Sequence, residues 1–317
     1  MRRRKKIDLY IVIFLFIVTV GYFIFTNISA DSKGYTGYSE ALKIYKTNDY
    51  EQAFVAFGKI PRNSNRKQAA LFRQARCATA LDKKELAVKK YKKVMHSNSK
   101  TAIVPISHYN MAVLLYELKD RSAKKHFKQI IKKYPSSDYA IASNYYLGMI
   151  AVQHPPKRPK KIAKSQERAL LYFKEYIQRA PDGRFSVNSI NEIKKLDVRL
   201  TNYDNLLIAK SYYLNGEYDN AKEFLNKTTL SESWTDFAKN EYKLGNKQRA
   251  NEYAEQGFKD FLSTAEPKDV HEVIDGYISS FPTRKEGIQK LLALNLKSTG
   301  ADYVAYLNCS EVVDKGV

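Results

Sequence analysis

DYEQAFVAFGKI, residues 49–60, is the first of four similar stretches that decide the fold. In each stretch an alanine is followed four residues later by an aromatic residue, and seven residues later by another apolar or aromatic residue. The other stretches are KKELAVKKYKKV (83–94), DRSAKKHFKQI (120–130) and SQERALLYFKEY (165–176). Because positions i, i+4 and i+7 lie on one face of an α-helix, the pattern predicts helices that present a small residue beside an aromatic one. The small residue allows a neighbouring helix to approach closely.

The alanines of these stretches recur at a nearly regular spacing. With two later alanines the series is Ala53, Ala87, Ala123, Ala169, Ala221 and Ala250. The first two intervals are 34 and 36 residues, and a period of about 34 residues is typical of helix–turn–helix units that stack into a solenoid. The spacing therefore predicts an all-α repeat protein.

Two of the longer intervals contain insertions. HPPKRPKKIAK (154–164) holds three prolines, and four bases fall within residues 157–161. The prolines predict an extended, non-helical segment, for which a solvated insertion is the favoured interpretation and a contact with lipid headgroups or wall polymer is the functional alternative. SVNSINEIKKL (186–196) predicts an additional helix.

The repeating region resembles the tetratricopeptide-repeat family. Leu147 and Gly148 stand at the family's Leu-Gly pair, and Gly216, Tyr218 and Ala221 match its Gly-x-Tyr-x-x-Ala turn. The remaining matches are Asn48, Tyr50, Ala53, Pro135, Pro181 and Trp234. The resemblance covers residues 35–262 and implies an all-α, TPR-like solenoid of six or seven helix pairs, in which the first helix of each pair lines a concave groove.

One segment, IIKKYPSSDYAIASNYYLG (130–148), is similar to repeats of bacterial envelope proteins. Two groups share this similarity: outer-membrane-assembly lipoproteins, and the helical solenoid of soluble lytic murein transglycosylases. The acylated cysteine of the first group is lacking, and residues 262–317 hold no Glu-Ser-Gly signature of a lysozyme-like domain. The alternative function is thus the non-catalytic superhelical portion of a peptidoglycan lytic transglycosylase without its catalytic domain.

Composition agrees with a helical fold. The 317 residues include only 13 Gly and 9 Pro, which disfavours an all-β protein. Lys and Arg exceed Asp and Glu by 54 to 33, giving a net charge of +21. Such an excess suits nucleic acid, an anionic surface or a lysine-rich proteome, but here bases and acids are interspersed, as on a solvated helix face.

The N-terminal part of the chain has a basic cluster followed by a long apolar run. MRRRKK (1–6) precedes LYIVIFLFIVTVGYFIF (9–25), which carries no charge. Residues 7–26 are long enough for a ~30 Å hydrocarbon core, and the basic cluster predicts that the N-terminus stays in the cytoplasm. A cleaved signal peptide ending at Ile28-Ser29-Ala30 is the alternative, but the apolar run exceeds the usual ~7–15 residues and favours an uncleaved signal anchor.

These patterns predict the organisation of the chain. It comprises a cytoplasmic basic segment (1–6), a transmembrane signal anchor (7–26), a linker (27–34), a TPR-like solenoid (35–262) and C-terminal helical pairs of the same array (263–317). The predicted location is the cytoplasmic membrane, with a single pass and the body in the periplasm or outside the cell.

No catalytic chemistry is evident in the sequence. The five histidines never occur as His-x-x-x-His, and phosphate-binding loops, nucleophile elbows and dinucleotide motifs are absent. Two cysteines exclude a disulfide framework; Cys77 is predicted in the core, and Cys309 as a free thiol or core residue. We therefore expect neither enzyme activity, nor a metal, nor a cofactor.

Binding is the expected activity, through the faces of the first helices. The candidate residues are Arg73, Arg76, Tyr109, Tyr145, Tyr146 and Lys210, with Tyr38, Tyr45, Phe72, His108, Tyr116, Met149 and Tyr213 selected by the same register. Tyrosine offers contact area with a polar tip, and arginine binds carboxylates through two parallel hydrogen bonds. The expected partners are proteins, acidic peptides or peptidoglycan, whereas nucleic acid is disfavoured for an exported body. Packing between repeats is the alternative role for these side chains.

Overall fold

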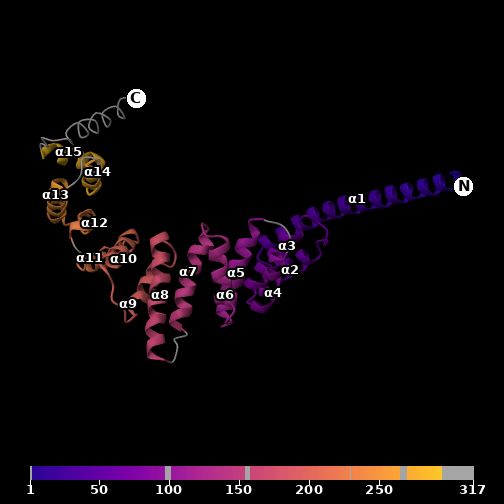
Figure 1. Ribbon diagram of the computed structural model, residues 1–317, viewed down its shortest axis with the longest axis horizontal. Coiled ribbons are helices and arrows are strands. Elements are labelled where there is room, and N and C mark those ends of the chain that lie inside the picture. The colour runs from indigo at the N-terminus through magenta and orange to yellow at the C-terminus, as the bar shows by residue number, and fades with distance from the viewer. Residues whose placement is uncertain (1, 97–100, 154–157, 229, 265–269, 295–317) are drawn as a thin grey trace. The chain divides into compact units, whose positions relative to one another are not determined.

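The computed structural model describes residues 2–96, 101–153, 158–228, 230–264 and 270–294 (Figure 1). Over these ranges the regular structure is α-helical, and no strand occurs among them. The helices are α1 (Arg2–Lys46), α2 (Tyr50–Gly58), α3 (Lys67–Ala80), α4 (Lys84–Met95), α5 (Ile103–Glu117), α6 (Ala123–Lys133), α7 (Asp138–Gln153), α8 (Pro159–Arg179), α9 (Ser186–Lys194), α10 (Asn202–Leu214), α11 (Tyr218–Leu225), α12 (Leu230–Lys243), α13 (Lys247–Thr264), α14 (Val270–Ser279) and α15 (Arg284–Ala293).

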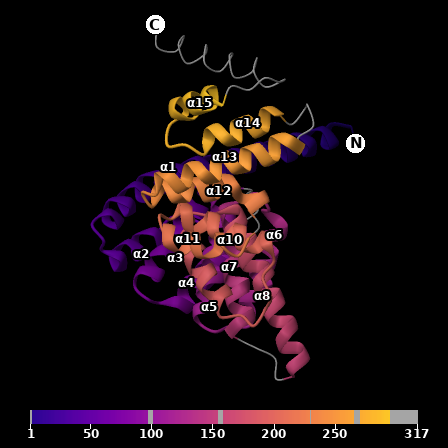
Figure 2. The same ribbon diagram turned by 90° about the vertical axis from the view of Figure 1, so that its left-hand side faces the viewer.

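The helices form two compact units, Met1–Leu147 (unit 1) and Gly148–Val317 (unit 2). In unit 1, α1 packs on α2, α3 on α4, and α5 on α6. In unit 2, α10 packs on α11, α12 on α13, and α14 on α15; Figure 2 shows α12 and α13 side by side. Each unit is a stack of consecutive helix pairs, so the predicted all-α, TPR-like solenoid is confirmed.

Burial confirms the predicted repeat register. The register alanines are at most 2% exposed: Ala53, Ala87, Ala123, Ala169, Ala221 and Ala250. The aromatic residues four positions later, Phe57, Tyr91, Phe127 and Phe173, are likewise at most 2% exposed. Gly148 of the Leu-Gly pair also packs closely, because a Cβ there would lie 2.5 Å from Cε1 of Phe173.

The turns within the helix pairs share one backbone feature. Asn48, Asp82, Gly216 and Gly245 have positive φ angles of 62°, 54°, 78° and 82°, and each precedes its register alanine by five residues. Lys119, four residues before Ala123, has φ 58°. Glycine adopts this left-handed conformation most readily, which explains the Gly of the family's turn at residue 216.

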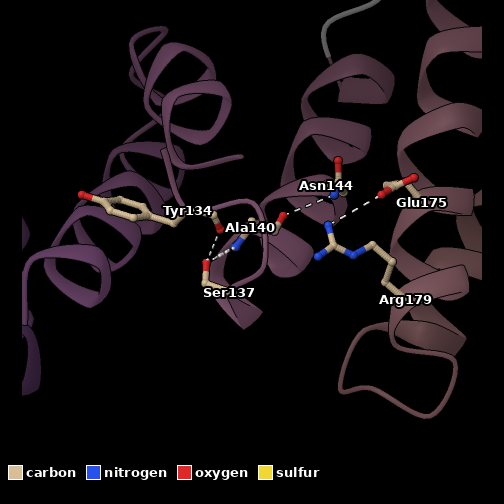
Figure 3. Close-up of polar contacts among 6 residues, drawn as sticks. All are labelled: Tyr134, Ser137, Ala140, Asn144, Glu175 and Arg179. Carbon is tan, nitrogen blue, oxygen red and sulfur yellow. Dashed lines mark hydrogen bonds and ion pairs between the residues drawn. The ribbon is translucent and has the colours of Figure 1, made fainter. Parts of the chain in front are cut away.

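The turn between α6 and α7 shows how short polar side chains fix a helix start (Figure 3). The Ser137 hydroxyl accepts a hydrogen bond from the Ala140 amide at 3.2 Å and donates one to the Tyr134 carbonyl at 2.7 Å. Asn144 Nδ2 donates to the Ala140 carbonyl at 3.2 Å. The Ala140 amide also donates to the Ser137 carbonyl at 2.9 Å, so the serine hydroxyl adds a second acceptor for an amide of the first helical turn.

The start of α8 differs from the prediction. Helix α8 starts at Pro159, so the expectation that residues 154–164 are non-helical is wrong for residues 159–164. Proline is tolerated at the first position of a helix because its missing N–H is not needed there. Residues 154–157, including Lys157, lie outside the described residues. The predicted extra helix at 186–196 is confirmed as α9.

Helix α1 includes both the predicted transmembrane segment (7–26) and the predicted linker (27–34). It runs without a break through the apolar run and through residues 27–34, the predicted linker. The large side chains between Leu15 and Phe25 are exposed, and this helix is long and apolar enough to cross a membrane. Residues 27–34 contain no proline, so nothing in this sequence interrupts helical hydrogen bonding.

The α2–α3 loop (59–66) packs against this part of α1. The Asn65 amide donates to Asp31 Oδ1 at 2.7 Å, and the Arg66 guanidinium lies 5.3 Å from the ring centroid of Tyr35. A Cβ on Gly34 would collide with the side chain of Ser64. The segment between the apolar run and the repeats is therefore held against the α2–α3 loop of unit 1.

Overpacking provides a test of the register. Replacing Ala123, which is 2% exposed, by leucine should reduce the free energy of unfolding by about 1–3 kcal/mol, because the close helix contact has no room for the added atoms. The same change at the exposed Lys125 should alter it by less than about 0.5 kcal/mol. Equal shifts of the melting temperature in the two variants would show that the register is misplaced.

Candidate binding site

Two of the predicted arginines form a cluster with one tyrosine in unit 1. The guanidinium carbons of Arg73 and Arg76, on α3, lie 5.3 and 5.8 Å from the ring centroid of Tyr45, on α1. Tyr45 is in turn held by Phe57 at 6.3 Å and Tyr50 at 5.4 Å. We call Tyr45, Arg73 and Arg76 the arginine cluster.

The charges of the arginine cluster are not neutralised by nearby acids. Arg73 is half-buried, Arg76 is exposed, and within the described ranges neither forms an ion pair with a carboxylate. Cation–π contact with Tyr45 orients the guanidinium groups but leaves their N–H donors able to bind a carboxylate. The cluster is thus suited to an acidic ligand.

Cys77, next to the arginine cluster on α3, is a core residue, as predicted. Its side chain is fully buried, and burial raises the pKa of the thiol to about 11, with Arg73 and Arg76 acting in the opposite direction. Because the thiolate is the reactive form, this cysteine is unsuited to nucleophilic chemistry. Cys309 lies outside the described residues.

The predicted tyrosines form a second group on α5 and α7. Tyr146 stacks on Phe127, with 5.0 Å between ring centroids and an interplanar angle of 4°. It also contacts Tyr109 at 6.2 Å, Tyr116 at 5.2 Å and Tyr145 at 5.4 Å. These half-buried rings join consecutive repeats of unit 1, so they combine packing with partial exposure. We call Tyr109, Tyr116, Tyr145 and Tyr146 the tyrosine cluster.

The structure brings the candidates together only in part. Arg73 and Arg76 share one cluster, and Tyr109, Tyr145 and Tyr146 share the other. That both clusters line the predicted concave groove remains a prediction. Lys210 belongs to unit 2, where it is exposed and lies 3.5 Å from Asp236 Oδ2.

Two residues selected by the register do not line a groove. Phe72 is 9% exposed and packs on Tyr91, with 6.1 Å between ring centroids. His108 is 1% exposed, and its Nε2 lies 3.1 Å from Nδ1 of His126. Both predictions are wrong because these side chains turn towards the second helix of their own pair. The His108–His126 contact spans two helices, and spacing within a single helix could not reveal it.

The histidine pair predicts a stability that depends on pH. Burial lowers the pKa of His108 to about 4, with His126 and Lys133 acting in the same direction, and burial also lowers the pKa of His126. Since the unfolded chain binds these protons near pH 6.5, the folded state should lose stability as pH falls from about 6.5 towards 4. Between pH 7 and pH 5.5 the loss assigned to His108 should be about 1 kcal/mol.

Urea unfolding at the two pH values measures this effect. His108→Gln keeps a polar side chain of similar size without titrating, so its loss between pH 7 and pH 5.5 should be smaller than that of the unmodified chain. If the variant and the unmodified chain lose the same stability, His108 is not the responsible group.

Sequence reasoning missed two buried carboxylates in unit 2. Asp204 is 2% exposed; burial raises its pKa, but hydrogen bonds from Lys174 and Thr201 outweigh burial, and the net pKa is lowered. Glu241 is 1% exposed and is paired with Lys222 at 2.7 Å. These pairs connect α8 to α10 and α11 to α12, so their role is structural. Among the described residues no group of three or more His, Cys, Asp or Glu side chains could hold a metal ion.

Comparison with known proteins agrees with the helix pairing. The tetratricopeptide-repeat family profile matches residues 69–101, 107–137 and 205–229. These segments coincide with the pairs α3–α4, α5–α6 and α10–α11. The family resemblance is thus supported in both units. No curated protein is significantly similar to the chain.

Solved structures of repeat proteins also resemble the chain. The TPR2AB domain of yeast Sti1, in a complex described with pHSP90, is 11% identical, with 78% of this chain and 98% of that chain covered and a TM-score of 0.35. The C-terminal part of a TPR repeat-containing protein from Cytophaga hutchinsonii is 14% identical, with 80% and 98% covered and a TM-score of 0.33.

Proposed function

We propose that the chain is a membrane-anchored, non-enzymatic TPR scaffold that binds protein or cell-wall partners on the outer side of the cytoplasmic membrane. The arginine cluster is the observation that carries this proposal. It presents two guanidinium groups on one face of α3, held by Tyr45 and without a carboxylate of the described chain to neutralise them. A surface of this kind attracts a partner that brings its own carboxylate.

The chemistry of the two clusters defines the class of partner. Arginine binds a carboxylate through two parallel hydrogen bonds, and tyrosine adds apolar area with a hydrogen-bonding tip. Such a lining fits an extended acidic peptide or the sugar–peptide polymer of the cell wall. No covalent step is required, in keeping with a repeat family that generally serves as a non-catalytic scaffold.

Membrane anchoring is supported by α1. Its exposed apolar side chains, from Leu15 to Phe25, have no partner helix within the described part of unit 1 that would remove them from water. The basic residues 2–6 precede this run and favour a cytoplasmic N-terminus. The repeats would then lie on the opposite side of the membrane.

Binding through the arginine cluster can be tested by substitution. Arg73→Ala should weaken capture of the partner by about 1–3 kcal/mol, the contribution of a charge-assisted hydrogen bond, and less at high salt. The measurement compares the full chain and the variant for binding to purified peptidoglycan and to solubilised envelope proteins over a concentration series.

The basic insertion provides the control. Replacing Lys157, Arg158, Lys160 and Lys161 by glutamine should reduce nonspecific adsorption but leave the specific affinity unchanged. If the four substitutions in the insertion abolish specific binding and Arg73→Ala has no effect on it, the basic insertion binds the partner. The arginine cluster then contributes only to packing.

A further inference from the structure

Unit 1 has two edges, which are defined by the ends of its helices. Helices α1 and α3 run in the same direction, since Tyr35 lies beside Arg66 and Tyr45 lies beside Arg73. Helix α4 runs in the opposite direction, because its last turn accepts a hydrogen bond, at the Val94 carbonyl, from Gln68 at the start of α3. The first helix of a pair, such as α3, therefore begins at one edge, and the second helix, such as α4, ends at the same edge. We call this the proximal edge. The opposite edge is the distal edge.

Helix α1 leaves unit 1 at the proximal edge (Figure 1). Asp31, which holds the α2–α3 loop through Asn65, lies five residues beyond Thr26, the end of the predicted membrane segment. At 1.5 Å per residue this distance is about 8 Å along the helix. Lipid headgroups extend roughly 5–8 Å beyond the hydrocarbon core on each side. The loop thus reaches the level of the headgroups when α1 crosses a bilayer.

The two edges differ sharply in charge. The basic residues of the proximal edge are Lys59, Arg62, Arg66, Lys67, Lys92, Lys93, Lys132 and Lys133, and its acids are Asp31 and Asp138. At the distal edge, the loops and terminal helical turns hold six acids and eight bases: Asp49, Glu51, Asp82, Glu85, Glu117 and Asp120 against Lys43, Lys46, Lys83, Lys84, Lys119, Arg121, Lys124 and Lys125. Ion pairs such as Lys84–Glu117, at 3.0 Å, form at the distal edge. Bases therefore exceed acids by six at the proximal edge and by only two at the distal edge.

The proximal cations also repel one another. Burial lowers the pKa of Lys67, and Arg62 and Lys93 lower it further. The Lys67 ammonium donates to a neutral acceptor, the Ile60 carbonyl, at 2.6 Å. Lys67 is the first residue of α3, where the helix dipole disfavours positive charge, and the first turn of α3 contains no acid. An anionic surface beside this edge would relieve both unfavourable interactions.

We propose that the proximal edge of unit 1 docks on the anionic lipid headgroups of the leaflet from which α1 emerges. The proposal rests on the membrane anchoring proposed above. Each basic side chain near an anionic membrane shifts binding by about fivefold. Because α1 continues without a break into the first repeat, docking sets the orientation of the repeats on the bilayer.

Vesicle experiments with the full chain test the docking. A fluorophore is attached at Asn63→Cys in the α2–α3 loop, or at Thr47→Cys on the distal edge, in a Cys309→Ser background; the buried Cys77, with its raised pKa, should react slowly. All vesicles carry the same amount of a nitroxide-headgroup lipid as quencher. Quenching at position 63 should increase when phosphatidylglycerol replaces part of the phosphatidylcholine, whereas quenching at position 47 should not.

Two triple variants with equal charge change separate docking from general electrostatics. Arg62→Gln with Lys92→Gln and Lys132→Gln should abolish the increase, lowering the ratio of docked to undocked molecules on the order of a hundredfold. Lys46→Gln with Lys119→Gln and Arg121→Gln, on the distal edge, should retain it. Quenching that is independent of phosphatidylglycerol, or lost equally in both variants, overturns the proposal.

Two further outcomes have distinct meanings. Flotation of the chain with pure phosphatidylcholine vesicles reports anchoring by α1 independently of charge; a chain that does not float refutes the anchoring and, with it, the docking. If polyphosphate binds the labelled chain while phosphatidylglycerol has no effect on quenching, the edge recognises a soluble phosphate polymer, and the lipid proposal is overturned.

Discussion

Replacing Phe173 by alanine is expected to lower the free energy of unfolding of unit 2 by about 3–5 kcal/mol. Phe173 is fully buried on α8, and its ring fills the space left by the missing side chain of Gly148 on α7. Removing the ring leaves a cavity at the contact between Phe173 and Gly148. Denaturant unfolding followed by far-ultraviolet circular dichroism measures the change.

Leu171 provides a matched control on the same helix. It is 64% exposed, two residues from Phe173, so Leu171→Ala should change the free energy of unfolding by less than about 0.5 kcal/mol. Equal destabilisation by the two variants would contradict the assignment of Phe173, and of its register, to the core.

Arginine in place of Phe16 should prevent stable membrane insertion. Phe16 lies near the middle of the apolar run and is 68% exposed. An arginine near the centre of a membrane helix costs about 3 kcal/mol relative to phenylalanine, which lowers the inserted fraction by roughly a hundredfold. A reporter that is active only outside the cytoplasm, fused after Val317, should lose its activity in this variant.

Phe16→Leu is the control for this experiment, because leucine inserts as readily as phenylalanine. Reporter activity should then be retained. A cytoplasm-only reporter that works after Val317 in the unmodified chain would refute the proposed topology, whatever the behaviour of Phe16→Arg.

The repeat core could be predicted from sequence because it depends on contacts within a short span. An alanine and an aromatic residue four positions apart must share a helix face, and burial of Ala87 and Tyr91 follows once that face is covered. The small residue at Gly148 was indicated instead by the resemblance to the family's Leu-Gly pair, and the structure gives its reason, because close helix contact excludes a Cβ there.

The start of α8 was harder to predict, since proline has opposite effects in different places. Proline interrupts the interior of a helix but suits its first turn, and the sequence alone did not show that Pro159 occupies that first position. The segment 27–34 presented a similar difficulty. Its polar composition resembles a linker, but contacts with Ser64 and Asn65, thirty or more residues away along the chain, fix it against the α2–α3 loop.

The candidate site was predictable as a set of residue types but only partly as a geometry. Arg73 and Arg76 share a helix face by their spacing, whereas their contact with Tyr45 depends on how α1 packs against α3. His108 satisfied the same spacing rule and is nevertheless buried, because His126 on the next helix offers it a hydrogen-bond partner. Helix periodicity shows on which face of its helix a residue lies. Tertiary packing decides which neighbouring helix covers that face.

The unbroken course of α1 limits where a partner can be captured. Tyr45 lies nineteen residues beyond Thr26, so with α1 inserted as proposed above, a straight helix would place the arginine cluster roughly 28 Å above the hydrocarbon core. A flexible tether of the same length would let the cluster search a broad volume near the bilayer. In the proposed anchored state, the rigid helix would instead keep the cluster at one height above the bilayer, and a carboxylate held much farther from the membrane would remain beyond its reach.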